Sequence, residues 1–269
     1  MSKIQEAIRA SRKSAHSAGY AVRTGTHPKI DAVPHTAPLH LHGRPVLALN
    51  EQQMERSCLL PFVKTKGATN AYMLLRTRLM QRMRENDWHS LMVTGTVPDE
   101  GKTTTAINVA IGISHDVNQA VLLVDLDLDR PSIAKSLGLE QTTGLSDYLR
   151  GDADCDDVLY NTDVKRLFVL PNFEQVSSAD SLTTPRMLAL FQHIKQLESK
   201  PLVIFDMPPI LSSDSVLAIA PQIDALLFVI SEGRTPRRLL KRASQMVEEI
   251  PRAGTVLNRS TEGDTGAYY

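Results

Sequence analysis

The chain has 269 residues, enough to bury a sizeable core as one α/β domain with a tail or as two small domains. Its 30 Lys and Arg residues balance 30 Asp and Glu residues, which excludes an overall electrostatic attraction to nucleic acid or anionic lipid. The two cysteines, Cys58 and Cys155, lack metal-ligand spacing and fit a reducing compartment. No apolar run has signal-peptide or membrane-spanning character, so we expect a cytoplasmic protein.

Residues 1–60 are expected to form a mostly disordered, basic N-terminal segment, because they are rich in Ser, His, Pro and cationic side chains. Up to residue 50, Glu6 and Asp31 are outnumbered by cationic residues: Lys3, Arg9, Arg12, Lys13, Arg23, Lys29 and Arg44. The irregular spacing of the histidines favours a solvated tail over a metal site; they are His16, His27, His35, His40 and His42. Contact of this segment with an acidic membrane surface or a partner stays open as an alternative.

Strand and helix signals alternate along the rest of the chain. Apolar residues at helical spacing, among them Tyr72, Leu75 and Leu79, predict a helix from residue 66. Short apolar runs predict strands at 90–94, 120–125, 166–170, 202–206, 225–230 and 255–257, with helices after residue 101 and at 131–137, 185–197, 213–220 and 236–250. This predicts an α/β domain over residues 61–259, with a parallel sheet and helices on both faces. Residues 260–269 are too polar to pack and predict a short flexible tail that carries Tyr268 and Tyr269.

The segment after the first predicted strand has the spacing of a phosphate-binding loop. Residues 96–103 match G-x-x-x-x-G-K-[ST], with Thr96 in the first glycine position. Such a loop offers backbone amides, a helix N-terminus and a cation to a nucleotide triphosphate, which makes the fold P-loop NTPase-like. The predicted nucleotide-binding residues are Thr96, Val97, Pro98, Asp99, Glu100, Gly101, Lys102, Thr103 and Thr104. Lys102 would lie along the β- and γ-phosphates and Thr103 would bind Mg²⁺; the alternative is a loop that contains Gly-Lys-Thr by chance.

Two further predicted strands end in carboxylates. One runs into Asp125, Asp127 and Asp129; if it stays extended, Asp125 and Asp127 point the same way and both face a metal. The alternative is a polar strand end in which Asp129 caps the next helix. Another strand ends in Asp206, typical of a carboxylate that holds Mg²⁺ through water. The three segments together predict a site for ATP and Mg²⁺ whose metal ligands are Thr103, Asp127 and Asp206.

Together these motifs resemble the cytoplasmic domain of the bacterial tyrosine autokinases (BY-kinases) that accompany exopolysaccharide and capsule export. That family has P-G-E-G-K-[ST] in its phosphate loop, D-x-D-x-x-R-P in a second strand and D-x-P-P in a third. The counterparts here are residues 98–103, 125–131 and 206–209, and the resemblance covers residues 71–258. It implies an ATP-dependent protein-tyrosine autokinase that uses Mg²⁺ and regulates polysaccharide synthesis and export.

The resemblance also implies roles and partners. Lys102, Asp125 and Asp127 would be catalytic, with Asp125 taking the proton from a tyrosine hydroxyl. Tyr268 and Tyr269 would be the phosphoacceptors, since an extended tail of about ten residues reaches roughly 33 Å. The expected partner is a membrane-embedded polysaccharide chain-length protein that recruits the chain to the inner face of the cell membrane. Self-association is a further expectation, and no nucleic acid is expected.

Three parts of the family pattern are considered separately: the phosphate loop, the helix before it and the end of the last strand. Asp99 replaces a loop glycine; Asp tolerates unusual backbone angles, but its charge near the phosphates predicts weaker ATP binding than glycine gives. Asn70, Met73 and Arg76 stand where the family has E-x-x-R-x-x-R, a pattern linked to ring assembly, and only Arg76 matches. Asn258 corresponds to the position that contacts adenine in related P-loop proteins, with a turn residue as the alternative.

Two other functions stay open. A partitioning or positioning ATPase of the ParA and MinD type shares the expected fold, but those proteins have a signature lysine early in the loop, where this chain has Val97 or Pro98. A nucleotide-gated, non-enzymatic adaptor of a polysaccharide export system would keep Lys102 and transfer no phosphate.

Overall fold

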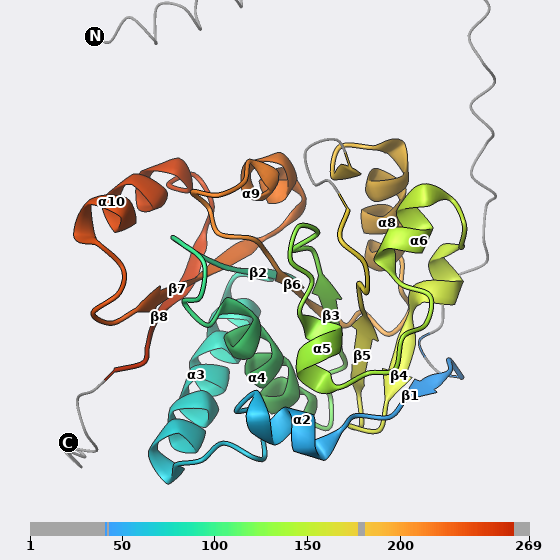
Figure 1. The fold of residues 1–269 in the computed structure, drawn as a ribbon, viewed down its shortest axis with the longest axis horizontal. Helices are drawn as coiled ribbons and strands as arrows, with labels where there is room; N and C mark the ends of the chain where they lie inside the picture. Colours follow the sequence, from blue (N-terminus) through green and yellow to red (C-terminus); the bar gives the residue numbers. More distant parts are fainter. Residues whose placement is uncertain (1–40, 42, 177–180, 261–269) are drawn as a thin grey trace, which may run out of the picture. The chain divides into compact units, whose positions relative to one another are not determined.

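In a computed structural model of the chain, which describes residues 41, 43–176 and 181–260, eight strands form one sheet (Figure 1). The strands are Val46–Leu47 (β1), Ser90–Gly95 (β2), Val121–Asp125 (β3), Tyr160–Thr162 (β4), Leu167–Leu170 (β5), Leu202–Asp206 (β6), Ala225–Ser231 (β7) and Arg252–Asn258 (β8). Their order in the sheet is β1-β4-β5-β3-β6-β2-β7-β8. Neighbouring strands are parallel, apart from the antiparallel pair β4 and β5.

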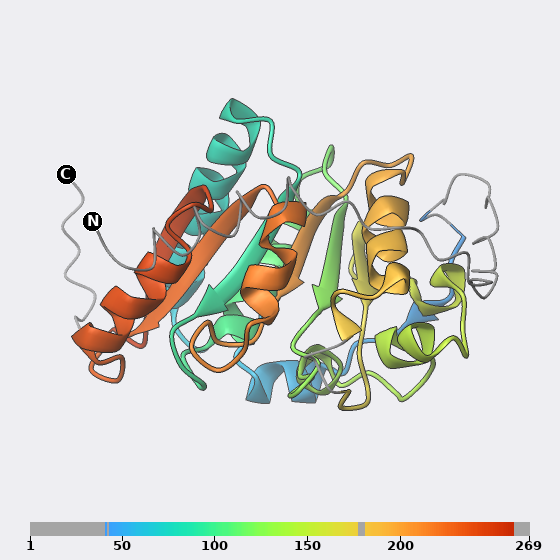
Figure 2. The same ribbon diagram turned by 90° about the horizontal axis from the view of Figure 1, so that it is seen from above.

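Helices cover both faces of this sheet, as Figures 1 and 2 show. One face carries α2 (Glu51–Arg56), α3 (Lys66–Glu85), α4 (Lys102–Ser114) and α5 (Ile133–Leu137). The other carries α6 (Leu145–Arg150), α8 (Pro185–Lys195), α9 (Ser215–Ile219) and α10 (Arg237–Met246). Two short 3₁₀ helices, η1 (Cys155–Val158) and η2 (Ala220–Gln222), belong to the connections. The predicted α/β class with a helical layer on each face is therefore confirmed.

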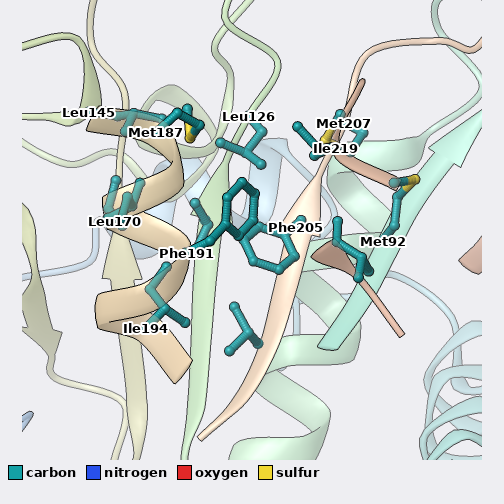
Figure 3. Close-up of a cluster of buried hydrophobic side chains, with 14 of the residues drawn as sticks. Met92, Leu126, Leu145, Leu170, Met187, Phe191, Ile194, Phe205, Met207 and Ile219 are labelled. Atoms are coloured by element: carbon teal, nitrogen blue, oxygen red, sulfur yellow. The ribbon is translucent and has the colours of Figure 1, made fainter. Parts of the chain in front are cut away.

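The central strands are uniformly apolar because successive side chains enter two different parts of the core. In β6, Val203 and Phe205 pack in the cluster that includes α8 and α9, whereas Leu202 and Ile204 pack in the cluster that includes α3 and α4. Phe205 contacts Phe191 of α8, with ring centroids 5.4 Å apart (Figure 3). Packing on both faces thus fixes the central strands and the loops that follow them.

The sequence patterns do not predict β1 or β4, and the antiparallel pairing of β4 with β5 corrects the expectation of a wholly parallel sheet. Tyr160 pairs with Val169, and Asn161 pairs with Phe168. Only residues 163–166 join the two strands. A connection between parallel strands needs a dozen or more residues. Because this connection is much shorter, β5 must run antiparallel to β4.

The predicted N-terminal segment of residues 1–60 ends in two ordered elements, β1 and α2. Asn50 begins α2, because its side chain accepts a hydrogen bond from the Gln53 amide at 3.0 Å. Its own amide donates to the Leu137 carbonyl at 2.9 Å, and Met54 is buried in the core. Residues 1–40 and the tail with Tyr268 and Tyr269 lie outside the described residues. In the part of the chain that is described, every helix is too short or too polar to cross a membrane.

Candidate functional site

Three loops meet at the carboxyl edge of the sheet. Strand β6 lies between β2 and β3, so Val93 of β2 and Asp125 of β3 both stand opposite Asp206. The loops that follow these three strands surround a cavity of about 570 Å³. Open α/β sheets bind their ligands outside the carboxyl ends of the strands, so this cavity is the candidate site.

The phosphate loop places a helix N-terminus and a cation at this cavity. Gly101 has a φ of +88° in the left-handed region, and the 13-residue helix α4 begins directly after it at Lys102. The positive end of the helix dipole favours a phosphate there. Lys102 lines the cavity with 7% of its surface exposed, and its Nζ lies 3.4 Å from the Val97 carbonyl oxygen. Asp99, at a φ of +63°, also lines the cavity and adopts the backbone angle that favours glycine.

Thr103 and Asp206 form a contact suited to Mg²⁺. The Thr103 hydroxyl donates to Asp206 Oδ2 at 2.6 Å, and Asp206 is fully buried. Burial raises the pKa of Asp206 to about 7, although the Thr103 hydrogen bond and the charge of Lys102 oppose that rise. Within the described residues, the buried Asp206 Oδ1 has no hydrogen-bond partner. A hydroxyl beside an unpartnered carboxylate oxygen is the donor set that Mg²⁺ prefers, so the residues present fit this ion.

Asp125 and Asp127 take different positions because β3 ends at Asp125. Asp125 Oδ2 accepts from the amides of Ser132 and Ile133, both at 2.9 Å, and its Oδ1 accepts from the Asp127 amide at 3.3 Å. Burial, then the charge of Asp206, raises the pKa of Asp125 well above its usual range. Asp127 lines the cavity, and its Oδ1 accepts from the Arg130 amide at 3.1 Å. The strand is therefore not extended through Asp127, and only Asp127 of the two belongs to the cavity lining.

Glu100 lies inside the loop and not on the cavity surface. Glu100 is 1% exposed, and its Oε2 accepts from the amides of Thr96 at 2.5 Å and Val97 at 3.0 Å. Its Oε1 accepts from the hydroxyl of Thr235, which follows β7. Asn258, at the end of β8, donates from Nδ2 to the Glu100 carbonyl at 2.9 Å. Glu100 thus joins the phosphate loop to the ends of two neighbouring strands.

The structure brings most, but not all, of the predicted nucleotide-binding residues to the cavity. Those that line it are Pro98, Asp99, Gly101, Lys102, Thr103 and Thr104. Thr96, Val97, Glu100 and Asn258 lie behind them and do not line it. Asp129, Arg130, Pro208 and Pro209 of the predicted motifs also line the cavity. Residues outside these motifs complete the lining: Ser132, Gln175, Ser212, Ser213 and Arg259. Ser212 and Ser213 lie just beyond the D-x-P-P motif, which is the signal that points to them.

The sequence matches one protein family model and several named proteins. The AAA domain family model matches residues 97–252. The chain is 29% identical to tyrosine-protein kinase YwqD of Bacillus subtilis over 72% of this chain and 81% of that protein. It is 26% identical to tyrosine-protein kinase Etk of Escherichia coli over 81% of this chain. It is 25% identical to succinoglycan biosynthesis transport protein ExoP of Rhizobium meliloti over 70% of this chain. The chain spans only 31% of Etk and 24% of ExoP.

Solved structures show the same fold. The kinase domain of Escherichia coli tyrosine kinase Etk superposes with a TM-score of 0.67 at 25% identity, covering 85% of this chain and 95% of that domain. The septum site-determining protein MinD of Pyrococcus horikoshii, solved with Mg-ADP, gives a TM-score of 0.54 at 23% identity over 65% of this chain and 71% of MinD. The similarity to MinD shows the fold alone.

Proposed function

Because the chain belongs to the AAA domain family, we propose that it is an ATP-dependent protein-tyrosine kinase that regulates the synthesis and export of an extracellular polysaccharide. The observation that carries this proposal is the cavity lined by Lys102, Thr103 and Asp127, with the buried Asp206 bonded to the Thr103 hydroxyl. The similarity to YwqD, Etk and ExoP supports the reaction class and the polysaccharide setting.

Each group at the cavity has a role in phosphoryl transfer. Lys102 and the N-terminus of α4 would hold the phosphates of ATP and offset their charge. Thr103, Asp127 and Asp206 would hold Mg²⁺, which supplies further positive charge when it is bound. Asp127, which lines the cavity, would face the reacting groups in place of Asp125, the proton acceptor expected from the resemblance. Asp125, bonded to the Ser132 and Ile133 amides, would position the segment that carries Asp127. Tyr268 and Tyr269 are the proposed acceptors.

A labelling experiment tests this proposal. The purified chain is incubated with Mg²⁺ and ATP labelled at the γ-phosphate, beside Lys102→Met and a variant that lacks Tyr268 and Tyr269. We expect label on the wild-type tail, a loss of at least about 100-fold in Lys102→Met, and no label on the truncated tail. Released phosphate without labelled protein would instead identify a MinD-type ATPase. Neither product would identify a nucleotide-gated adaptor.

The proposed partners follow from the relatives. We propose that the chain works in the cytoplasm at the inner face of the membrane, next to a membrane-embedded chain-length protein, because its relative ExoP is a succinoglycan biosynthesis transport protein. Self-association, which would let one subunit phosphorylate another, is part of the same proposal.

Asp99→Gly is expected to tighten Mg–ATP binding by about fivefold, because a carboxylate at the cavity wall repels the phosphates. Calorimetric titration with Mg–ATP measures the change. The matched control is Asp87→Gly, since exposed Asp87 also has a positive φ of 55° but does not line the cavity. Both variants relieve the same kind of backbone strain, so only the charge effect separates them. Equal affinity in Asp99→Gly and wild type would show that the Asp99 carboxylate does not act on the nucleotide.

A further inference from the structure

Helix α10 and the turn before it concentrate positive charge in a chain whose net charge is zero. Residues 233–247 contain no Asp or Glu. They contain five cationic residues, here called the α10 basic face: Arg234, Arg237, Arg238, Lys241 and Arg242. All five are exposed. In the described ranges, none of the five side chains makes an ion pair or a hydrogen bond.

The helix directs this charge away from the protein. Leu240, Ala243 and Val247 follow one another at helical spacing and belong to the core, so they define the inner side of α10. At 3.6 residues per turn, Arg238 and Lys241 fall on the opposite side. Figure 1 shows α10 beside β7 and β8, at the end of the sheet away from α6. The basic face is therefore presented to whatever lies outside this end of the domain.

The arrangement of these charges opposes helix stability. Arg237 and Arg238 occupy the first turn of α10, where the helix dipole disfavours cations. Arg237 and Lys241, like Arg238 and Arg242, are four residues apart, a spacing at which like charges repel. Glu248 and Glu249 line a surface pocket with Arg237 and Lys241, but residues 233–247 themselves hold no acidic side chain. A basic cluster that weakens its own helix points to an anionic surface outside the chain.

We propose that the α10 basic face docks on an anionic membrane surface, by attraction to lipid headgroups. Each Lys or Arg near such a surface adds to the attraction, and the row of charges along one exposed helix side suits a flat array of headgroups. Residues 232–252 contain no aromatic side chain, so the face has nothing on which bases of single-stranded nucleic acid could stack. The proposal rests on the proposed function for the expectation that the chain works beside a membrane.

Vesicle co-sedimentation of the full chain without nucleotide tests this inference. The probes are vesicles of phosphatidylcholine alone and vesicles of equal parts phosphatidylcholine and phosphatidylglycerol. The test variant combines Arg237→Gln, Arg238→Gln, Lys241→Gln and Arg242→Gln. The matched control removes four exposed cations elsewhere, by Arg56→Gln, Arg78→Gln, Lys135→Gln and Lys165→Gln. The cationic residues up to residue 50 are the same in every form, so their contribution cancels.

We expect wild type and control to bind the anionic vesicles at low salt, and the α10 variant to lose at least about tenfold in partition coefficient. A smaller variant, Arg238→Gln with Arg242→Gln, should lose an intermediate amount, and high salt should release all forms. Lys102→Met should bind vesicles as wild type does, which separates this inference from the kinase proposal. Equal losses of vesicle binding in the α10 variant and the control, or no vesicle binding by wild type, would overturn the proposal that the α10 basic face docks on a membrane. Binding to a DNA duplex or an acidic polypeptide without vesicle binding would overturn it in favour of that partner.

Discussion

Gly101→Ala is expected to weaken Mg–ATP binding about 100-fold, because a penalty of roughly 3 kcal/mol falls on the phosphate loop. Gly101 has a φ of +88°, where a side chain costs about 1–2 kcal/mol. A Cβ at this position would lie 2.0 Å from Asn258 Nδ2. Asn258 would have to move, which breaks its hydrogen bond to the Glu100 carbonyl, worth about 1 kcal/mol. Calorimetric titration with Mg–ATP measures the loss, and thermal unfolding shows that the variant is folded.

Two further variants separate the clash from a general effect of adding a methyl group. Gly112 lies inside the same helix, and a Cβ there meets nothing nearer than 3.8 Å. Gly112→Ala should stabilise the fold by about 0.5–1 kcal/mol and leave ATP affinity unchanged. Asn258→Ala combined with Gly101→Ala removes the clash but keeps the strain, so it should recover part of the affinity, with a coupling of at least about 0.5 kcal/mol. Wild-type affinity in Gly101→Ala would contradict the loop geometry.

The central strands are predictable from sequence because each is buried on both faces. Strands β2, β3 and β6 each contain an unbroken apolar run, of three residues in β2 and four in β3 and β6, and a glycine or a carboxylate ends each strand. The outer strands lack such a signal. β1 has two residues, and Asn161 at the centre of β4 donates to the Arg44 carbonyl at 3.0 Å. Contacts with neighbours, more than their own composition, make these segments strands.

Some features of the candidate site are likewise predictable from the sequence and others are not. Lys102, Thr103 and Asp206 are predictable because motif spacing fixes each residue relative to a strand end. The orientation of the Asp125 side chain is not predictable from the sequence, because it depends on where the chain turns after β3. The turn after β3 brings the Ser132 amide to 2.9 Å from the Asp125 carboxylate, a contact that no local spacing reveals. Residues that reach the cavity from other loops depend on the order of the strands, which the sequence patterns leave open.

Glu100→Ala is expected to lower the free energy of unfolding by roughly 3 kcal/mol and Mg–ATP affinity by about tenfold. The carboxylate is the acceptor for the Thr96 and Val97 amides inside the loop, and its loss leaves both donors without that partner. The Val97 carbonyl lies 3.4 Å from Lys102 Nζ, so a shift of this segment also displaces the cation that would hold the phosphates. Chemical denaturation measures the stability, and titration well below the unfolding midpoint measures the affinity of folded protein.

Glu100→Gln and Thr235→Val show whether this effect comes from the shape of the loop or from stability alone. A glutamine keeps one acceptor oxygen for the loop amides and can donate to the Thr235 hydroxyl, so it should stay within about 1 kcal/mol of wild type and bind ATP nearly as well. Thr235→Val removes the donor to Glu100 Oε1 and also the acceptor of the Ser231 amide, which lies 3.2 Å from the Thr235 hydroxyl, so it should lose about 1–2 kcal/mol of stability at unchanged affinity. If Glu100→Ala also kept wild-type affinity, the loop would hold its shape without the carboxylate. If instead affinity falls only in Glu100→Ala, the acceptor that Glu100 supplies to the Thr96 and Val97 amides is what keeps Lys102 at the cavity.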